Sequence, residues 1–518
     1  MCFMEFLNIM FASKENYNVW IYNKSNCDQT ASDLNIPDVV DYFEKNYTDF
    51  PIEYLYKPCL NQKDAEYRLE IMQELCSRKA LLCNLADFCD DMRELRKMLR
   101  DTREEKHEIQ KQYRYLLTFG KYTENLIDLK TLLADAVSSG LRHIHNQCSE
   151  IAGSQKMAEA YGIALDLIRQ ISEVLNKTGI LINPNEKTIT VIDCEETSES
   201  AHLSEEIFDA CELKVKPHYS ITSALAFSFF EERILNVLIS ENPELFESLN
   251  NFYENYMDFK DNIRNFVNLI PQFAFYVAYT EFAANASLQK MPICRPVFDE
   301  GGFYASECAA ITLLVKFSGE NEYNIVKNDI KLKKGGAFLL SGPNQGGKTI
   351  YLKTLGTTAY LAKCGCYVFC RECQLPFYDN IFTHFVQKEV LGKSRLAEEI
   401  ERIDTSVNSL SFNTLVLLNE SFTSTRRKDS VELAIYYLKK FEEIKCSVGF
   451  VSHFYEIPEV YNGGKNNIIS LRSKIAEGGK RTYEICENKG DGLAYAKDIA
   501  YSCGMTYEQI MGEIIGKL

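Results

Sequence analysis

The segment GPNQGGKT, residues 342–349, has the residue types and spacing that hold phosphate groups. It fits the pattern G-x-x-x-x-G-K-[ST], and it lies between a short apolar run and a segment of helical composition. Glycines let backbone N–H groups approach phosphates, and the N-terminus of the following helix adds a favourable dipole. The pattern predicts a nucleotide-binding loop made of Gly342, Pro343, Asn344, Gln345, Gly346, Gly347, Lys348 and Thr349.

Two side chains of this loop have separate expected roles. Lys348 is expected to reach the β- and γ-phosphates of ATP, and the Thr349 hydroxyl is expected to ligate Mg²⁺ directly. The sequence therefore predicts ATP and Mg²⁺ as the bound groups.

Two apolar runs downstream end in polar residues that suit hydrolysis. The run TLVLLNE ends in Asn419 and Glu420, and SVGFVSHF carries His453. Glu420 is placed to polarise the attacking water, and His453 is placed to contact the γ-phosphate. Asn419 stands where ATPases of this kind usually have Asp, so we expect it to hold a Mg²⁺-bound water without supplying charge. These residues predict an ATPase, with slow turnover.

The elements that position these residues follow from the apolar pattern. After residue 290, short apolar runs alternate with helical segments and glycine-rich turns, which predicts an α/β domain at 291–518 with a mainly parallel sheet. Residues 1–50 form a short N-terminal segment, and 51–290 are helical in pattern, with an arm at about 94–235. The fold class is a helical region followed by an α/β ATPase domain.

Three segments of the helical half are distinctive. Apolar residues recur at spacings of three and four over 249–270, which indicates a heptad seam that packs in the core. Residues 94–114 have few apolar residues and predict a helix exposed all round, with seven basic and five acidic side chains. Two β-type runs flank NPNEK within 178–200 and predict a hairpin.

Composition narrows the class of protein. The 518 residues are 46% hydrophobic and 25% charged, with a formal net charge of −16, which suits a folded protein of two to four domains rather than a generally basic nucleic-acid coat. The first twenty residues lack the basic start and cleavage site of a signal peptide, and no apolar run is long enough for a membrane span. We expect a cytoplasmic protein that does not associate with membranes.

Four of the 18 cysteines cluster in CGCYVFCREC. Close thiols can bind zinc, but structural zinc sites usually take ligand pairs from separated knuckles. We expect reduced, buried thiols, with CYVF forming a strand. The cluster consists of Cys364, Cys366, Cys370 and Cys373.

Beyond these patterns, the chain resembles the MutS proteins of DNA mismatch repair, which are ABC-type ATPases. The likeness covers about residues 35–518 and is most specific after 320, in SGPNQGGKTIYLKTLG, GKSRLAEEI, NESFTSTRRKDSVELA and SHFYEI. It implies an ATP-dependent DNA clamp that works as a homodimer. It also implies that Asn328 lies on the adenine side, and that Ser394 and Glu399 belong to a signature segment that completes the partner's nucleotide site.

The chain also departs from that family. About 50 residues precede the predicted lever, which is too short for the mismatch-reading and connector domains, so recognition by the family's wedge is not expected. The alternative is a nucleotide-gated scaffold for a protein or RNA complex, with little turnover. Asn419 and the weakly basic arm favour that alternative.

Overall fold

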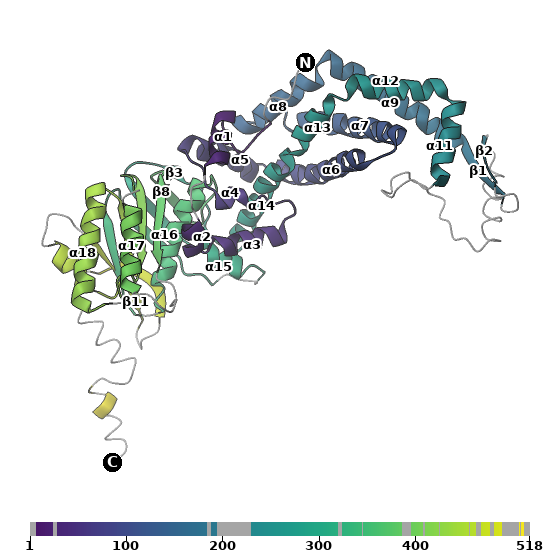
Figure 1. The fold of residues 1–518 in the computed structure, drawn as a ribbon. Coiled ribbons are helices and arrows are strands. Elements are labelled where there is room, and N and C mark those ends of the chain that lie inside the picture. The colour runs from purple at the N-terminus through teal and green to yellow at the C-terminus, as the bar shows by residue number, and fades with distance from the viewer. Residues whose placement is uncertain are drawn as a thin grey trace. The chain divides into compact units, whose positions relative to one another are not determined.

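The computed structural model divides into two compact units. The helical unit comprises described residues within 1–8, 83–137 and 141–270, and the α/β unit comprises described residues within 9–82, 138–140 and 271–518. Figure 1 shows the elements of each unit. The structure describes residues 7–23, 28–183, 188–193, 229–319, 324–343, 345–385, 395–407, 410–423, 425–454, 456–462, 468–476, 481–488, 507 and 509–511.

The helical unit is built from long helices with an aromatic core. Helix α7 packs against α9, α12 and α13. The ring of Phe119 on α7 lies 5.5 Å from that of Phe252 and 5.3 Å from that of Phe259. The elements with residues in this unit are α6 (Lys79–Glu104), α7 (Glu108–Leu132), α8 (Ser139–Ala152), α9 (Gln155–Lys177), β1 (Thr178–Asn183), β2 (Thr188–Asp193), α11 (Phe229–Glu241), α12 (Pro243–Tyr256) and α13 (Phe259–Val267).

The heptad seam at 249–270 is buried, as predicted, but it does not lie on one helix. Its residues are 9% exposed or less, which confirms core packing. The helix ends after α12 and again after α13, so the seam is shared by α12, α13 and the first residues of the following helix α14 (Leu269–Leu288). The hairpin prediction is confirmed, since β1 and β2 pair antiparallel from Thr178↔Asp193 to Asn183↔Thr188.

The prediction of one exposed helix over 94–114 is wrong. Helix α6 ends at Glu104, and α7 begins at Glu108 after an extended His107. Polar groups hold this turn: Thr102 Oγ1 lies 3.0 Å from Thr118 Oγ1, and Arg114 pairs with Glu105 at 3.1 Å. The sparse apolar residues mark a turn between two packed helices rather than a helix that bridges solvent.

The α/β unit places helices around two mixed sheets. Its helices are α1 (Lys14–Tyr22), α2 (Asp28–Asp33), α3 (Ile36–Asn46), α4 (Glu53–Tyr56), α5 (Gln62–Ser77), α14 (Leu269–Leu288), α15 (Ile311–Lys316), α16 (Lys348–Lys363), α17 (Arg395–Val407), α18 (Arg427–Ile444) and α19 (Ile457–Asn462). Its strands are β3 (Val297–Phe298), β4 (Gly302–Cys308), β5 (Asn328–Lys333), β6 (Ala337–Ser341), β7 (Glu372–Leu375), β8 (Asn380–Phe385), β9 (Thr414–Asn419), β10 (Ser447–Val451), β11 (Ile469–Ile475) and β12 (Arg481–Glu487).

The six-stranded sheet has the order β12-β11-β6-β10-β9-β8. Its pairs from β11 to β8 are parallel, and β12 pairs antiparallel to β11. The second sheet, β3-β7-β4-β5, is also mixed. A helical region followed by an α/β domain is therefore confirmed, while the predicted domain boundaries stay predictions.

The cysteine cluster is buried, as expected, but CYVF is not a strand. Val368 makes only an isolated bridge with Cys294, and Cys373 lies on β7. All four thiols of the cluster are 3% exposed or less. Within the described residues, no group of three or more His, Cys, Asp or Glu side chains is arranged to hold a metal.

One further prediction concerns membranes. In the part of the chain that the structure describes, none of the helices combines the length and the apolar character that crossing a membrane requires.

Helix α16 lies so close to its neighbours that Gly356 has no room for a side chain. A Cβ there would meet Leu34 Cδ2 and lie 2.6 Å from Leu417 Cδ1. Gly356→Ala should therefore lower the free energy of unfolding by about 1–3 kcal/mol, the usual cost of overpacking.

Gly162 of α9 is the matched control, because a Cβ there meets nothing within 4 Å. Gly162→Ala should stabilise by up to about 1 kcal/mol through helix propensity. Urea unfolding of both variants checks this, and a stabilising Gly356→Ala would contradict the packing.

Candidate functional site

The loop between β6 and α16 needs glycine at three positions. Gly342 and Gly347 have φ angles of 138° and 90°, which other residues rarely adopt. A Cβ on Gly346 would lie 2.7 Å from Ser473 Oγ of β11, and one on Gly342 would meet the same atom. The loop 342–347 therefore packs directly against Ser473, and we call this loop with Ser473 the cradle. Asn344, predicted in this loop, lies outside the described residues.

Ser473 is a residue that the sequence patterns did not identify. Its side chain is 6% exposed, and among the described residues its Oγ has no hydrogen-bond partner. A buried hydroxyl without a partner is costly, so an acceptor placed in the cradle would relieve that cost. Only the pairing of β11 with β6 brings Ser473 under the loop.

Lys348 is folded against its own loop. Its Nζ donates to the carbonyl oxygens of Gly342 at 2.6 Å and Pro343 at 2.9 Å, and the residue is 4% exposed. Burial lowers the pKa of the Lys348 ammonium, and the nearby charge of Glu420 partly opposes this. The charge lies within the cradle, where an anion would stabilise it.

The structure brings together two residues predicted to act on Mg²⁺. Thr349 Oγ1 donates to Asn419 Oδ1 at 3.2 Å. Thr349 is in the first turn of α16 and Asn419 is the last residue of β9, so the sheet connects positions 70 residues apart. The pair offers two neutral oxygens and no carboxylate.

Glu420 and His453 also meet. His453 Nε2 lies 3.0 Å from Glu420 Oε1, and the side chains are 38% and 37% exposed, so water can reach both. The hydrogen bond from His453 lowers the pKa of the Glu420 carboxyl; partial burial opposes this, and the charges of His453 and Lys348 assist it. Glu420 is therefore an ionised acceptor beside the loop.

Asn328 acts on the loop indirectly. Its Oδ1 accepts from Ile485 N–H at 2.7 Å and its Nδ2 donates to Tyr483 O at 3.1 Å, so its amide holds β12. Tyr483 in turn lies beside the loop, since a Cβ on Gly347 would be 3.5 Å from its Cδ1. Tyr483, with φ 60° and 49% exposure, is a second residue that the sequence did not identify.

The predicted signature residues are not both visible at the site. Ser394 lies outside the described residues. Glu399, on α17, is 7% exposed, and its Oε2 accepts from Phe422 N–H of the same chain at 3.0 Å. The role of Glu399 in the nucleotide site of a partner stays a prediction.

A buried histidine completes the surroundings of Glu420. His384 on β8 is 2% exposed, and its Nδ1 lies 2.8 Å from Ser421 Oγ. The pKa of His384 is lowered to about 4, mainly by burial and next by the charge of Arg402. A backbone hydrogen bond opposes this shift with a smaller effect. The imidazole is therefore neutral at pH 7. Sequence spacing gave no sign of this pair, because strand pairing alone brings β8 next to β9.

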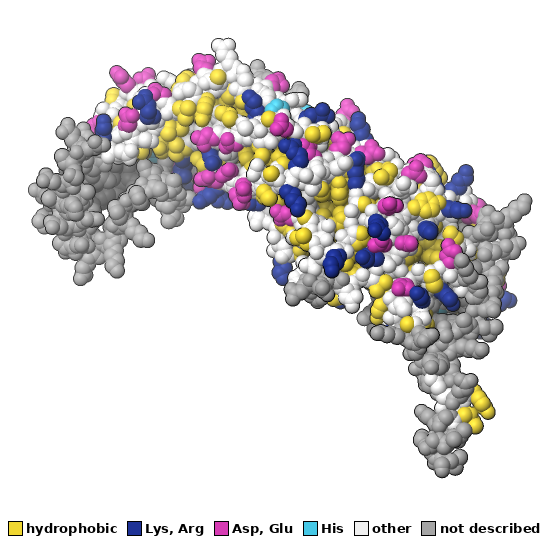
Figure 2. All heavy atoms as spheres, turned by 180° about the vertical axis from the view of Figure 1, so that it is seen from behind, with side chains coloured by type: hydrophobic (Ala, Val, Ile, Leu, Met, Phe, Trp, Pro, Cys, Tyr) yellow, Lys and Arg dark blue, Asp and Glu magenta, His cyan; other side chains and the backbone are white. Residues whose placement is uncertain are grey.

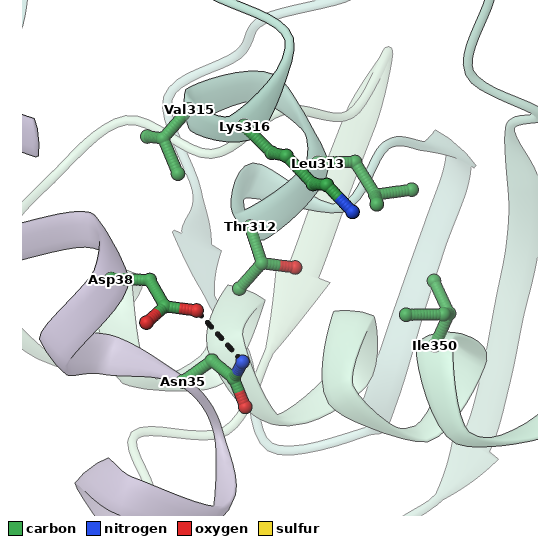
Figure 3. Close-up of a pocket in the computed structure, with 7 residues that line it drawn as sticks. All are labelled: Asn35, Asp38, Thr312, Leu313, Val315, Lys316 and Ile350. Carbon is green, nitrogen blue, oxygen red and sulfur yellow. Dashed lines mark hydrogen bonds between the residues drawn. The ribbon is translucent and has the colours of Figure 1, made fainter.

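A cavity of about 440 Å³ opens beside α16 but is separate from the cradle. Figure 3 shows Asn35 hydrogen-bonded to Asp38 on one side of the cavity, Thr312 and Lys316 of α15 above it, and Ile350 on the opposite side. The cavity contains none of the residues predicted to bind nucleotide. It therefore does not represent the predicted phosphate site.

Comparison with known proteins identifies similar proteins for the C-terminal part of the chain. Residues 338–489 match the family model of MutS domain V. The chain is 28% identical over 255 residues to DNA mismatch repair protein MutS of Thermosipho melanesiensis, which covers 47% of this chain and 29% of that protein. It is 31% identical over 145 residues to DNA mismatch repair protein MSH3 of Arabidopsis thaliana, covering 27% of this chain and 13% of that protein.

The fold and site thus define an α/β domain with a glycine-rich loop between a central strand and a helix. Over residues 338–489, this domain is similar to domain V of the MutS proteins. The matched regions span less than a third of the length of the two relatives described.

The buried His384 gives the α/β unit a defined pH response. Its pKa is about 4 in the folded protein against an ordinary 6.5, so the unfolded chain binds more protons between those values. Stability from this group is complete above pH 6.5 and is lost as pH falls towards 4, by up to about 3 kcal/mol. His384→Gln should therefore flatten the pH dependence of the unfolding free energy over pH 4–6.5, measured by urea titration. Parallel curves for variant and wild type would contradict this burial.

Proposed function

We propose that this chain is a MutS-like ATPase that binds DNA and uses ATP hydrolysis to open and close a dimeric clamp. The observation that carries the proposal is the meeting of Glu420, His453 and Lys348 where β6, β9 and β10 end. General base, contact residue and phosphate-binding cation are the parts that phosphoryl transfer to water needs.

The cradle suits the phosphates of ATP. Gly342 and Gly346 let the loop lie directly against Ser473, whose Oγ has no hydrogen-bond partner among the described residues. The ammonium of Lys348 lies at the carbonyl oxygen of Gly342 in the same loop. Binding phosphate would give Lys348 a charged acceptor in place of two loop carbonyls. The oxygen of Thr349 suits Mg²⁺, which neutralises phosphate charge when bound, and Asn419 would hold a water of that ion.

Hydrolysis needs a base and a contact for the transferred group. Glu420 is ionised and accessible to water, so it accepts the proton of the attacking water. As the water oxygen bonds to the γ-phosphorus, the bond to the β–γ bridging oxygen breaks, giving ADP and phosphate. His453 keeps Glu420 oriented and is placed to sense the γ-phosphate.

Replacing the base tests this assignment. Glu420→Gln should bind ATP with wild-type affinity but lower kcat by about a hundredfold or more, since general base catalysis contributes about 10²–10⁴. Turnover by phosphate release and binding of a fluorescent ATP analogue would measure the two effects separately.

Glu443→Gln is the matched control, because Glu443 is an exposed carboxylate on α18 of the same unit. It should keep wild-type turnover. Equal rates for Glu420→Gln and wild type would remove Glu420 from its role, and a wild type without turnover would favour the nucleotide-gated scaffold.

DNA is the proposed partner, supported by the names of the relatives and by charge on α6. Figure 2 shows basic and acidic side chains interspersed over the described part of the face drawn. Lys97, Arg100 and Arg103 are exposed and follow each other at three-residue spacing along α6. Arg100 Nε lies 3.7 Å from Asp101 Oδ1, whereas Lys121 of α7 lies 3.5 Å from Glu94 and 4.0 Å from Asp91.

The proposed dimer follows from the same likeness. In it, the segment around Ser394 of one subunit would complete the nucleotide site of the other.

Salt dependence tests the basic stripe of Lys97, Arg100 and Arg103. Each phosphate contact adds about 0.9 to the slope of log affinity against log salt. Changing the three residues to Gln should therefore weaken DNA binding and make the slope shallower by up to about 3. The control changes Lys428, Lys439 and Lys445, three exposed lysines of α18 and its end, to Gln, which removes the same charge. An unchanged slope in the α6 variant would place the DNA contact elsewhere.

A further inference from the structure

The turn Glu420–Phe422 has an unusual backbone. Glu420 has a φ of 55° and Phe422 a φ of 66°, the left-handed region that residues other than glycine rarely occupy. Such conformations persist only where the surrounding structure fixes them. The position of the Glu420 carboxylate therefore depends on the contacts that hold this turn.

Two contacts fix the backbone at the two ends of the turn. Glu420 N–H donates to Val451 O at 2.8 Å, and Phe422 N–H donates to Glu399 Oε2 at 3.0 Å. The second is the stronger kind, because a carboxylate accepts a backbone N–H and both groups are buried. Glu399 thus controls the far end of the turn from helix α17.

Two more contacts fix the side chains that flank Glu420. Ser421 Oγ lies 2.8 Å from His384 Nδ1, and both residues are at most 2% exposed. The ring of Phe422 is fully buried and stacks on Tyr437 at 5.2 Å, with the planes 2° apart. A shift of the turn would have to break buried polar and aromatic contacts together.

Helix α17 is attached to the neighbouring strand as well. Arg402, three residues after Glu399 and so close to the same face, has its Nη2 3.3 Å from Thr383 O of β8 and 3.5 Å from Asp33 Oδ2. Asp33 also accepts from Thr383 Oγ1 at 2.8 Å. Helix α17 therefore contacts β8 through Arg402 and the Glu420 turn through Glu399.

We infer that Glu399 and His384 are positioning residues for Glu420, and that Glu399 couples the location of helix α17 to the geometry of that carboxylate. The inference rests on the proposed role of Glu420 as base. Neither residue needs to touch nucleotide: Glu399 acts through Phe422 N–H, and His384 acts through Ser421.

The test separates positioning from binding. Glu399→Ala and Ser421→Ala should lower kcat for ATP about ten- to a hundredfold, the loss expected when a catalytic group is misplaced. The KM for ATP should stay within about twofold, because the phosphate cradle is untouched. Glu399→Gln should recover a large part of kcat, since its amide oxygen accepts the same hydrogen bond without the charge.

Asn413→Ala is the matched control. Asn413 is 9% exposed just before the opposite end of β9, and its Nδ2 donates to Phe377 O at 2.6 Å. The Asn413→Ala variant loses a buried hydrogen bond near β9 but keeps every contact of the turn Glu420–Phe422, so the kcat of this variant should stay near wild type.

Each outcome decides the inference. A wild type without ATP turnover would overturn the proposed function itself. Wild-type kcat in Ser421→Ala and Glu399→Ala, or an equal fall in Asn413→Ala, would overturn the positioning role while leaving the ATPase proposal standing. If thermal unfolding shows that Glu399→Ala does not fold, Ser421→Ala decides alone, and a wild-type kcat in Ser421→Ala overturns the role.

Discussion

The register of the parallel strands is the constraint on which the site depends. Leu340 of β6 pairs with Val451 of β10, and Val451 pairs with Asn419 of β9. Parallel strands end at one edge, so residues that follow them must meet there. The loop after β6, Glu420 after β9 and His453 after β10 come together for this reason. A one-residue slip of β9 would turn Asn419 and Glu420 to the opposite faces and separate Asn419 from Thr349.

Buried polar contacts then refine what the register brings together. Strand pairing places Glu420 at the edge of the sheet where the loop lies. The left-handed backbone at Glu420 and Phe422 needs further contacts to hold it. Glu399 of α17 and His384 of β8 provide these contacts, to Phe422 N–H and to Ser421 Oγ. The same packing explains Gly356, where α16 approaches β9 too closely for a side chain. The Glu420–His453 pair itself is partly exposed.

Local patterns predicted much of this architecture, and the failures have physical causes. Apolar runs ended by polar residues located β6, β9 and β10, and the loop motif located Lys348 and Thr349, because these signals lie within short stretches. Ser473, Tyr483 and His384 come from β11, β12 and β8, and only long-range pairing brings them to the site. The prediction of one helix over 94–114 was wrong because composition did not show that the hydroxyls of Thr102 and Thr118 would hydrogen-bond across a turn.

The central claim is that the cradle beside Glu420 binds ATP with Mg²⁺. Calorimetric titration of the full chain with a slowly hydrolysed ATP analogue, with and without Mg²⁺, tests it most directly when wild type is compared with Lys348→Ala. The account predicts saturable binding that Mg²⁺ strengthens and that Lys348→Ala abolishes or weakens by about a hundredfold, about 2.7 kcal/mol. Absence of binding to wild type, or undiminished binding to Lys348→Ala, would contradict it.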